Sequence, residues 1–268
     1  MKPGIACLCK LFSACFAFIA ALLMSTPGAR ADDAGYLWSY ILNDSYSSDT
    51  FYSADFTKPF GASSPIRPFG ELLLQRDSRT VGGVLPQTLN DNYGLAALGL
   101  QYQSAAGLRI FGQVGSSFAF GPATPSTATT KHFDWRGGTE YYRDWSDQPG
   151  TGHRVIGSFY GDVIYYSRYK NAILYFQAER GREFGKVNHP IQAYARLSGS
   201  QDTRRYYYNE VVALTGGVRY LPFGRTGPSF ALEEAYSNYL APGAALASAN
   251  VARDYWSFRP TLTFGTNF

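Results

Sequence analysis

The sequence predicts an all-β fold, an antiparallel transmembrane barrel of about 12 strands, with about 10–14 compatible with the pattern. Three observations indicate this fold. Apolar and polar residues alternate at period two through most of the chain after residue 31. Aromatic residues equal charged residues, at 16% each, whereas about 25% charged is usual for a soluble domain. No apolar run after residue 31 approaches the roughly 20 residues that a membrane-spanning helix needs.

The first 31 residues read as a cleaved secretory signal peptide, and a barrel domain is expected over 32–268. Two lysines accompany an apolar run over 11–24, and residues 29–31 form a small-x-small cleavage site. Lipid attachment at Cys15 is the alternative, but the apolar stretch before that cysteine is shorter than the roughly 7–15 residues of a signal h-region. All three cysteines lie in this segment, so we expect no disulfide, zinc–cysteine site or cysteine nucleophile in the exported chain.

The charge of the exported chain excludes nucleic acid as a partner. The whole sequence has 24 Lys and Arg against 20 Asp and Glu. Lys2, Lys10 and Arg30 belong to the signal, so the remainder is close to neutral. A nucleic-acid-binding domain carries a basic face or a much higher pI.

Turn residues divide the alternating chain into twelve expected strands. In the last one, from Trp256 to Phe268, the even positions are mostly apolar and the odd positions mostly polar, which is typical of a strand between two environments. Strands of about 9–11 residues or more, separated by turns, are the pattern of a transmembrane barrel. The expected strands are 36–43, 50–57, 66–76, 93–103, 107–120, 131–143, 153–166, 170–180, 190–199, 206–220, 227–239 and 254–268.

A secreted soluble β-sandwich is the alternative fold, because its strands alternate in the same way. Its polar faces would meet water and carry many lysines, yet lysine is nearly absent from these strand interiors. Tyrosine and tryptophan instead collect near strand ends, where a membrane barrel places its aromatic girdles. These rings belong to Tyr36, Trp38, Tyr141, Tyr142, Trp145, Tyr165, Tyr166, Tyr206, Tyr207, Tyr208, Tyr255 and Trp256.

The chain ends on Phe268 with apolar residues such as Phe264 at period two before it. This resembles the terminal β-signal by which the barrel-assembly machinery recognises outer-membrane barrels, although Thr266 stands where an aromatic residue is frequent. The resemblance implies an outer membrane of Gram-negative type and two periplasmic termini. The outer connections would then be 44–49, 77–92, 121–130, 167–169, 200–205 and 240–253, and the inner ones 58–65, 104–106, 144–152, 181–189 and 221–226. Residues 167–169 are short for an outer loop, which argues against the strand count.

Residues 179–184 (Glu-Arg-Gly-Arg-Glu-Phe), the strand of Tyr194 and residues 216–223 (Gly-Gly-Val-Arg-Tyr-Leu-Pro-Phe) resemble the C-terminal barrel of phage-adsorption-protein-A (NfrA) type proteins. That resemblance covers roughly the second half of the chain and implies association with exopolysaccharide export. It departs from the family before the barrel, where those proteins usually carry long periplasmic helical repeats and this chain begins its strands soon after Asp32.

The polar strand faces direct a set of charged residues into the lumen. Arginine is the only strong base among them, and its guanidinium forks onto carboxylates in a way that lysine cannot. A ladder of interior ion pairs is one interpretation, and a polar track for sugars or ions with tyrosines as stacking faces is the other. The expected lumen residues are Glu71, Arg109, Asp134, Arg136, Glu140, Asp162, Glu179, Arg196, Arg219, Glu233 and Arg259 with His132, and the tyrosines Tyr142, Tyr160, Tyr166, Tyr175 and Tyr194.

We expect no catalytic residues, metal or cofactor. His132 and Asp134 share a face, as a base and its orienting acid would, but the His-x-Ser pattern of barrel phospholipases and lipid A deacylases is absent. Three histidines without spacing partners give no metal site. The adjacent Glu233 and Glu234 would place one carboxylate toward lipid unless a bulge turns it inward.

These patterns favour a passive outer-membrane barrel, a channel or surface component tied to envelope or exopolysaccharide transport. Its expected partners are outer-membrane lipid, the barrel-assembly machinery and envelope polysaccharide. A closed structural or receptor barrel that binds a phage or another partner is the alternative, and an outer-membrane hydrolase is the third hypothesis.

Overall fold

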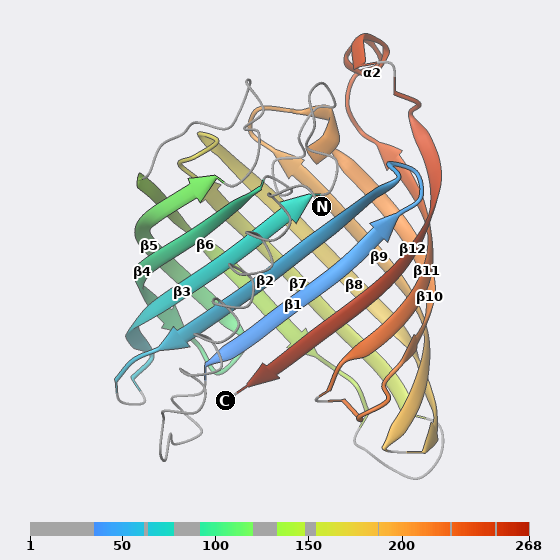
Figure 1. Ribbon diagram of the computed structural model, residues 1–268, viewed down its shortest axis with the longest axis horizontal. Coiled ribbons are helices and arrows are strands. Elements are labelled where there is room, and N and C mark those ends of the chain that lie inside the picture. Colours follow the sequence, from blue (N-terminus) through green and yellow to red (C-terminus); the bar gives the residue numbers. More distant parts are fainter. Residues whose placement is uncertain are drawn as a thin grey trace, which may run out of the picture.

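The chain folds into a closed antiparallel barrel of twelve strands in the computed structural model, which confirms the predicted fold class (Figure 1). The structure describes residues 35–61, 64–77, 92–119, 133–147, 154–186, 188–225, 227–249 and 251–267. The predicted signal peptide 1–31, His132 and Phe268 lie outside these ranges. The strands are β1 (Tyr36–Asp44), β2 (Asp49–Pro59), β3 (Ile66–Asp77), β4 (Tyr93–Gln103), β5 (Leu108–Ala119), β6 (Phe133–Asp144), β7 (Arg154–Tyr166), β8 (Asn171–Lys186), β9 (His189–Asp202), β10 (Val211–Tyr220), β11 (Ser229–Tyr239) and β12 (Asp254–Asn267).

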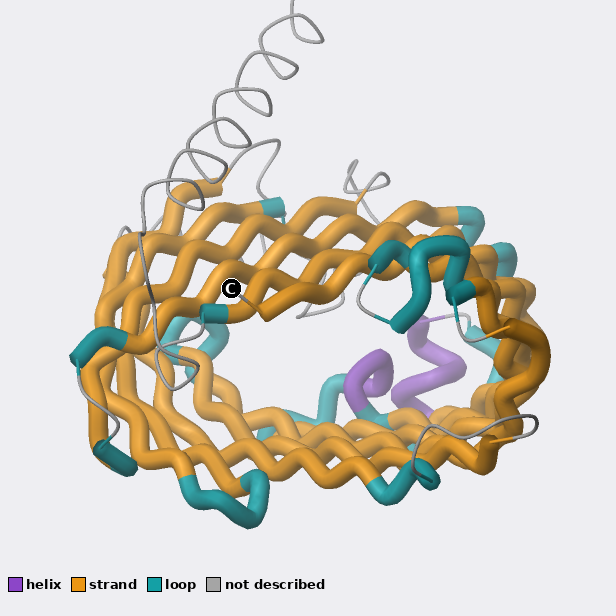
Figure 2. Tube along the Cα trace, turned by 90° about the horizontal axis from the view of Figure 1, so that it is seen from below, coloured by secondary structure: helices purple, strands orange, loops and turns teal. Residues whose placement is uncertain are grey.

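Each strand pairs with its neighbours in sequence, and β1 pairs with β12 to close the ring. This β1–β12 seam runs from Tyr36 opposite Asn267 to Leu42 opposite Thr261. Viewed along its axis, the barrel is an oval ring (Figure 2). We call the end where β1 begins and β12 finishes the terminal end, and the opposite end the far end. A short helix, α2 (Gly243–Ala249), stands at the far end.

Alternation decides which side chains face outward. Along β4, β5, β10 and β11, many of the alternate residues are apolar and exposed, and Leu98, Val114, Leu214 and Leu232 are each more than half exposed. The residues between them point into the barrel. No helix in the described part of the chain is long and apolar enough to cross a membrane.

The β8–β9 hairpin is longer than the sequence indicated. Most of the expected inner connection 181–189 is instead strand, because β8 continues to Lys186 and β9 starts at His189. The charged residues of this stretch continue the strand: Arg182 points outward and Glu183 points inward.

Two further expectations change at the far end. The strand expected over 206–220 begins only at Val211, since 203–210 is a loop with a short 3₁₀ helix, η2 (Tyr207–Asn209). Residues 167–170 form a tight turn in which Lys170 has a φ of 50°. A short far-end connection is therefore compatible with twelve strands.

Candidate functional site: the barrel lumen

The registers place the predicted charged residues on one face of the sheet, the inner face. Glu140 of β6 lies opposite Arg109 on one side and Asp162 on the other. Glu179 lies opposite Arg196, and a row of paired residues connects Glu71 through Ala97 and Gly115 to Asp134. The lumen therefore brings together acids and arginines from strands far apart in sequence.

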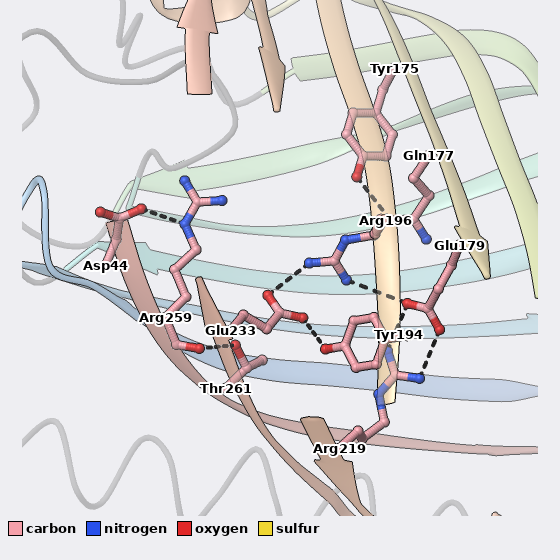
Figure 3. A network of polar contacts seen from close by, with 10 residues as sticks. All are labelled: Asp44, Tyr175, Gln177, Glu179, Tyr194, Arg196, Arg219, Glu233, Arg259 and Thr261. Carbon is pink, nitrogen blue, oxygen red and sulfur yellow. Dashed lines mark hydrogen bonds and ion pairs between the residues drawn. The ribbon is translucent and has the colours of Figure 1, made fainter. Parts of the chain in front are cut away.

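One group, the β8–β12 lattice, links charges across alternate strands (Figure 3). Arg196 of β9 lies 2.8 Å from Glu233 of β11 and 3.8 Å from Glu179 of β8. Arg219 of β10 donates to both carboxylate oxygens of Glu179, at 3.0 and 2.9 Å. The Tyr194 hydroxyl donates to Glu233, so this carboxylate has both a charged and a neutral donor.

The lattice is buried enough for its pairing to matter. The Glu233 side chain is 4% exposed and that of Glu179 is 11% exposed. Removing one member of a buried ion pair costs about 3–5 kcal/mol, because the other charge stays desolvated and unpaired. The lattice therefore ties β8, β9, β10 and β11 together from the inside.

A second group, the β3–β7 cluster, combines arginines with aromatic rings. Arg109 donates to Glu140 at 2.8 Å and its guanidinium lies 4.7 and 4.5 Å from the rings of Phe69 and Phe111. Arg136 contacts Asp134 at 3.3 Å. Planar guanidinium groups suit such sites because they stack on rings while they bond to carboxylates.

Arg136 of β6 also reaches past β5, since it donates to the Tyr93 hydroxyl of β4 at 3.0 Å.

The β2–β7 side of the lumen has more acids than paired arginines. Asp162 accepts a hydrogen bond from Tyr160 at 2.8 Å, and Asp55 accepts one from Thr57 at 3.1 Å. In the described part of the chain, no ion pair involves Asp55, Asp162 or Glu71. This side of the wall is acidic, whereas the β8–β12 lattice is balanced.

The predicted lumen tyrosines also face inward. Tyr142 and Tyr160 are paired across β6 and β7, and Tyr160 lies 6.1 Å from Tyr175 between ring centroids. Tyr175 donates to Gln177 at 3.0 Å. The remaining predicted ring, Tyr166, lies under the Arg136 guanidinium at 5.2 Å. Tyr142, Tyr160 and Tyr175 therefore lie on the adjacent strands β6, β7 and β8, whereas Tyr166 belongs to the β3–β7 cluster.

Several interior residues were missed by sequence reasoning. Asp44 at the end of β1 bonds to Arg259 at 2.8 Å, and Arg225 in the β10–β11 loop donates to Glu183. The hydrogen bond to Glu183 raises the pKa of the Arg225 guanidinium above its ordinary value. Asp55 lies on the polar face of its strand with Ser53 and Thr57, so the alternation of polar residues could have identified it as a lumen residue. No such signal predicted the Arg225 contact, because it joins the β10–β11 loop to β8, and β9 and β10 lie between them in the sequence.

The chain's own side chains pack on the inner wall of the barrel. Phe69 and Phe111, each the fourth residue from the terminal end of its strand, pack with Ile164 of β7 and so bridge alternate strands. At the far end, Tyr93 and Asp134 are 2% and 1% exposed. Water has little access to the far end of the lumen.

Turn and loop residues close the far mouth over this packed interior. Arg168 of the 167–170 turn is buried, donates to Ser117 of β5 at 3.1 Å and lies 5.0 Å above the Tyr93 ring. The 203–210 loop is held by Asp202, which accepts hydrogen bonds from the side chain of Asn171 at 2.9 Å and from the side chain of Asn209. The Arg168 side chain therefore reaches inward across the far mouth, and the 203–210 loop is fixed against the ends of β8 and β9.

The terminal half contains exposed aromatic rings, and one of them corrects a prediction. Trp38 was expected in an outer girdle, but its register with Asp55 and Gly265 places it inside, next to Tyr40 at 4.9 Å. It is 44% exposed, and Tyr142 is 52% exposed. Aromatic and apolar residues occupy both faces of β1, so alternation could not decide which face is inside.

The two adjacent glutamates of β11 face opposite ways without a bulge. Glu233 pairs in register with Gly217 and Arg259, and Glu234 with Gly216 and Phe258. Glu234 is exposed on the outer wall, on the terminal-end side of the paired rings of Tyr236 and Trp256. Among the described residues, no group of His, Cys, Asp and Glu is arranged to hold a metal ion.

Comparisons with known proteins describe the architecture alone. No family model and no curated protein sequence matches the chain. Similar solved structures include the β domain of the Bordetella autotransporter Brka, at 14% identity and a TM-score of 0.43, covering 87% of this chain and 99% of that one. LpxR from Salmonella typhimurium matches at 10% identity and a TM-score of 0.42, covering 85% and 99%.

An outer membrane channel from Pseudomonas putida F1 matches at 11% identity and a TM-score of 0.37, covering 91% of this chain and 99% of that one. All three TM-scores are below 0.5, so these likenesses carry no argument about activity. The strand pairing itself establishes what the chain is: a closed twelve-stranded antiparallel β-barrel.

Proposed function

We propose that the chain is a passive outer-membrane barrel whose lumen is closed on the cell-surface side. The apolar outer wall suits lipid and the charged inner wall suits a polar interior, as in transmembrane barrels. The short turns at the terminal end favour a periplasmic position for it, because transmembrane barrels have short periplasmic turns and longer surface loops. The far end, with its longer connections, then faces the cell surface.

The packed far half carries this proposal. Arg168, Tyr93 and Ser117 join a turn to two strands and leave little space for water. A permanently open pore would expose these groups to solvent. The geometry therefore favours a surface barrel with a structural or partner-binding role over an open porin.

A passive role also agrees with the contacts of the lumen acids. Glu140, Glu179 and Glu233 each contact an arginine, which gives each carboxylate a structural partner. A hydrolase needs a base within hydrogen-bond reach of a nucleophile. His189, the one histidine in the described part of the chain, lies exposed at the terminal end beside the Pro222 carbonyl.

A gated channel for envelope polysaccharide is the second candidate. It is favoured by the exposed rings of Trp38 and Tyr142, which face the interior in the periplasmic half. Aromatic faces offer apolar surface with a polar handle, which suits a sugar ring. The resemblance to NfrA-type barrels of exopolysaccharide systems points to the same cargo. Transport would require the Arg168 turn and the 203–210 loop to move away from the lumen.

Planar-bilayer conductance of the refolded protein tests the closed lumen. We expect wild type to conduct weakly and Arg168→Ala to conduct more, because this substitution removes the side chain that reaches Ser117. Lys170→Asn, an exposed position in the same turn, is the matched control and should behave as wild type. A stable, large wild-type conductance would overturn the closed barrel.

Liposome swelling with oligosaccharides separates the two candidates. A closed barrel gives no swelling with wild type, whereas a polysaccharide channel admits oligosaccharides and loses this permeation when Trp38 and Tyr142 are replaced by alanine. Heat-modifiable gel migration should verify the barrel in each variant. Recovery of the protein in the soluble fraction without detergent would refute the membrane location itself.

A further inference from the structure

We propose that the outer wall of β7, β8 and β9 binds the phosphate of an anionic phospholipid between Arg180 and Arg182. This inference rests on the proposed membrane location. Both residues point outward, since Arg180 pairs with Gly157 and Ala195, and Arg182 pairs with Val155. Both side chains are exposed.

Two outward arginines on one strand need an explanation. Charged residues on the lipid face of a barrel are destabilising at depth and are tolerated near the interface. Alternate residues of a strand lie on the same face, about 6–7 Å apart, so both guanidinium groups can reach one phosphate. In the described part of the chain, no ion pair or side-chain hydrogen bond is formed by Arg180 or Arg182.

A groove lies between these arginines. Its volume is about 420 Å³, and its lining includes Val155, Arg180, Arg182, Phe184, Ala193 and Ala195. The alanines opposite the two arginines on β9 keep its floor low. Val155 and Phe184 supply apolar surface for an acyl chain, while the guanidinium groups supply charge-assisted donors for a phosphate.

An aromatic residue marks the same level of the wall. The indole of Trp145 covers Gly157, because a Cβ at that glycine would come within 1.8 Å of its Nε1 atom. Gly157 is the partner of Arg180, so the indole and the guanidinium lie on neighbouring strands. Tryptophan is enriched at the headgroup level of membranes. Arg180 is therefore placed at a membrane interface rather than in the hydrocarbon core.

The position of the two arginines along the barrel indicates which leaflet of the membrane supplies the lipid. Arg182 pairs with Val155, the second residue of β7, and the β8–β9 hairpin continues beyond this level to Lys186 opposite His189. This is the terminal end, which the proposed function places in the periplasm. The ligand is therefore a phospholipid of the periplasmic leaflet, with phosphatidylglycerol as the probe.

The test is native mass spectrometry of the full chain after reconstitution in mixed phosphatidylethanolamine and phosphatidylglycerol. We expect wild type to retain phosphatidylglycerol in preference to phosphatidylethanolamine, and Arg180→Gln with Arg182→Gln to lower that preference about tenfold. Arg204→Gln with Arg205→Gln, at the far end, is the matched control and should keep it. The Arg180→Lys, Arg182→Lys variant should retain part of the preference, because it keeps the charge.

Three results would overturn the site: equal retention of both lipids by wild type, an unchanged preference in the glutamine variant, or, in a parallel sample that also contains lipopolysaccharide, a stronger preference for lipopolysaccharide than for phosphatidylglycerol. Heat-modifiable migration and membrane insertion are measured on the same samples. Failure to insert would refute the proposed function, whereas insertion without lipid preference would refute only this site.

Discussion

The guanidinium of Arg219 lies 4.3 Å from the ring centroid of Tyr194 and also donates to both carboxylate oxygens of Glu179. A planar group can stack on a ring with its face and bind a carboxylate with its edge. The same guanidinium reaches Gln192 at 3.0 Å. Arg219 therefore connects β8, β9 and β10 in a way that depends on its shape as well as on its charge.

Replacement of Arg219 by lysine should destabilise the barrel although the charge is kept. An ammonium cannot form the fork on Glu179, and hydrogen bonds to charged groups contribute about 1.5–3 kcal/mol each. We expect the free energy of unfolding in lipid vesicles, measured by urea titration, to fall by about 2 kcal/mol. Arg205→Lys, at an exposed loop position, should change it by less than about 0.5 kcal/mol. Equal effects of the two substitutions would contradict the role of the fork.

The adjacent glutamates of β11 should respond in opposite ways to leucine. Glu233→Leu leaves Arg196 without its 2.8 Å partner in the lumen, so we expect a loss of about 3–5 kcal/mol in unfolding free energy. Glu234→Leu removes a charge from the outer wall and should be neutral or stabilising. The measurement is the same urea titration, and each variant serves as the control for the other. If Glu234→Leu is the more harmful, the assignment of faces on β11 is wrong.

The fluorescence of Trp38 should be quenched by a water-soluble quencher and not by a quencher in the lipid. Its register places it in the lumen, whereas Trp256 is exposed on the outer wall. In variants that keep one tryptophan and replace the others by phenylalanine, brominated phospholipid should quench Trp256 strongly and Trp38 weakly. Aqueous iodide should show the reverse order. Strong quenching of Trp38 by brominated lipid would contradict its position in the lumen and favour a position in the outer girdle.

The sequence predicted the strands well because period-two alternation is a local signal. The expected 93–103 strand matches β4, the expected 107–120 strand differs from β5 by one residue at each end, and the expected 254–268 strand differs from β12 by one residue at one end. Wherever one face was clearly polar, the same alternation also indicated which charges point inward, as for Glu179 and Arg196. Alternate residues of a strand lie on the same face, so the face of every residue follows once the face of one residue is known.

The other features of the fold and the site depend on contacts that the alternation of residues along a strand does not specify. β1 has apolar residues on both faces, with Tyr36, Trp38 and Tyr40 on one and Leu37 and Ile41 on the other, so alternation did not predict the inward position of Trp38. The 203–210 loop leaves the strand pattern because Asp202 accepts hydrogen bonds from the loop backbone and side chains, among them the Tyr206 amide at 3.1 Å. Arg168 reaches Ser117, 51 positions away in sequence. Such partners are set by the curvature and closure of the sheet, which a linear pattern does not specify.

The β1–β12 seam has a consequence for how the chain reaches this structure. Asp44 and Arg259, which bond beside the seam, are 215 residues apart in sequence. Pairing of such distant segments is slow, because chain entropy is lost before the contact forms. Until it forms, β1 and β12 are both open edges that invite pairing with another chain. The period between export and closure is therefore when this barrel is most vulnerable to aggregation.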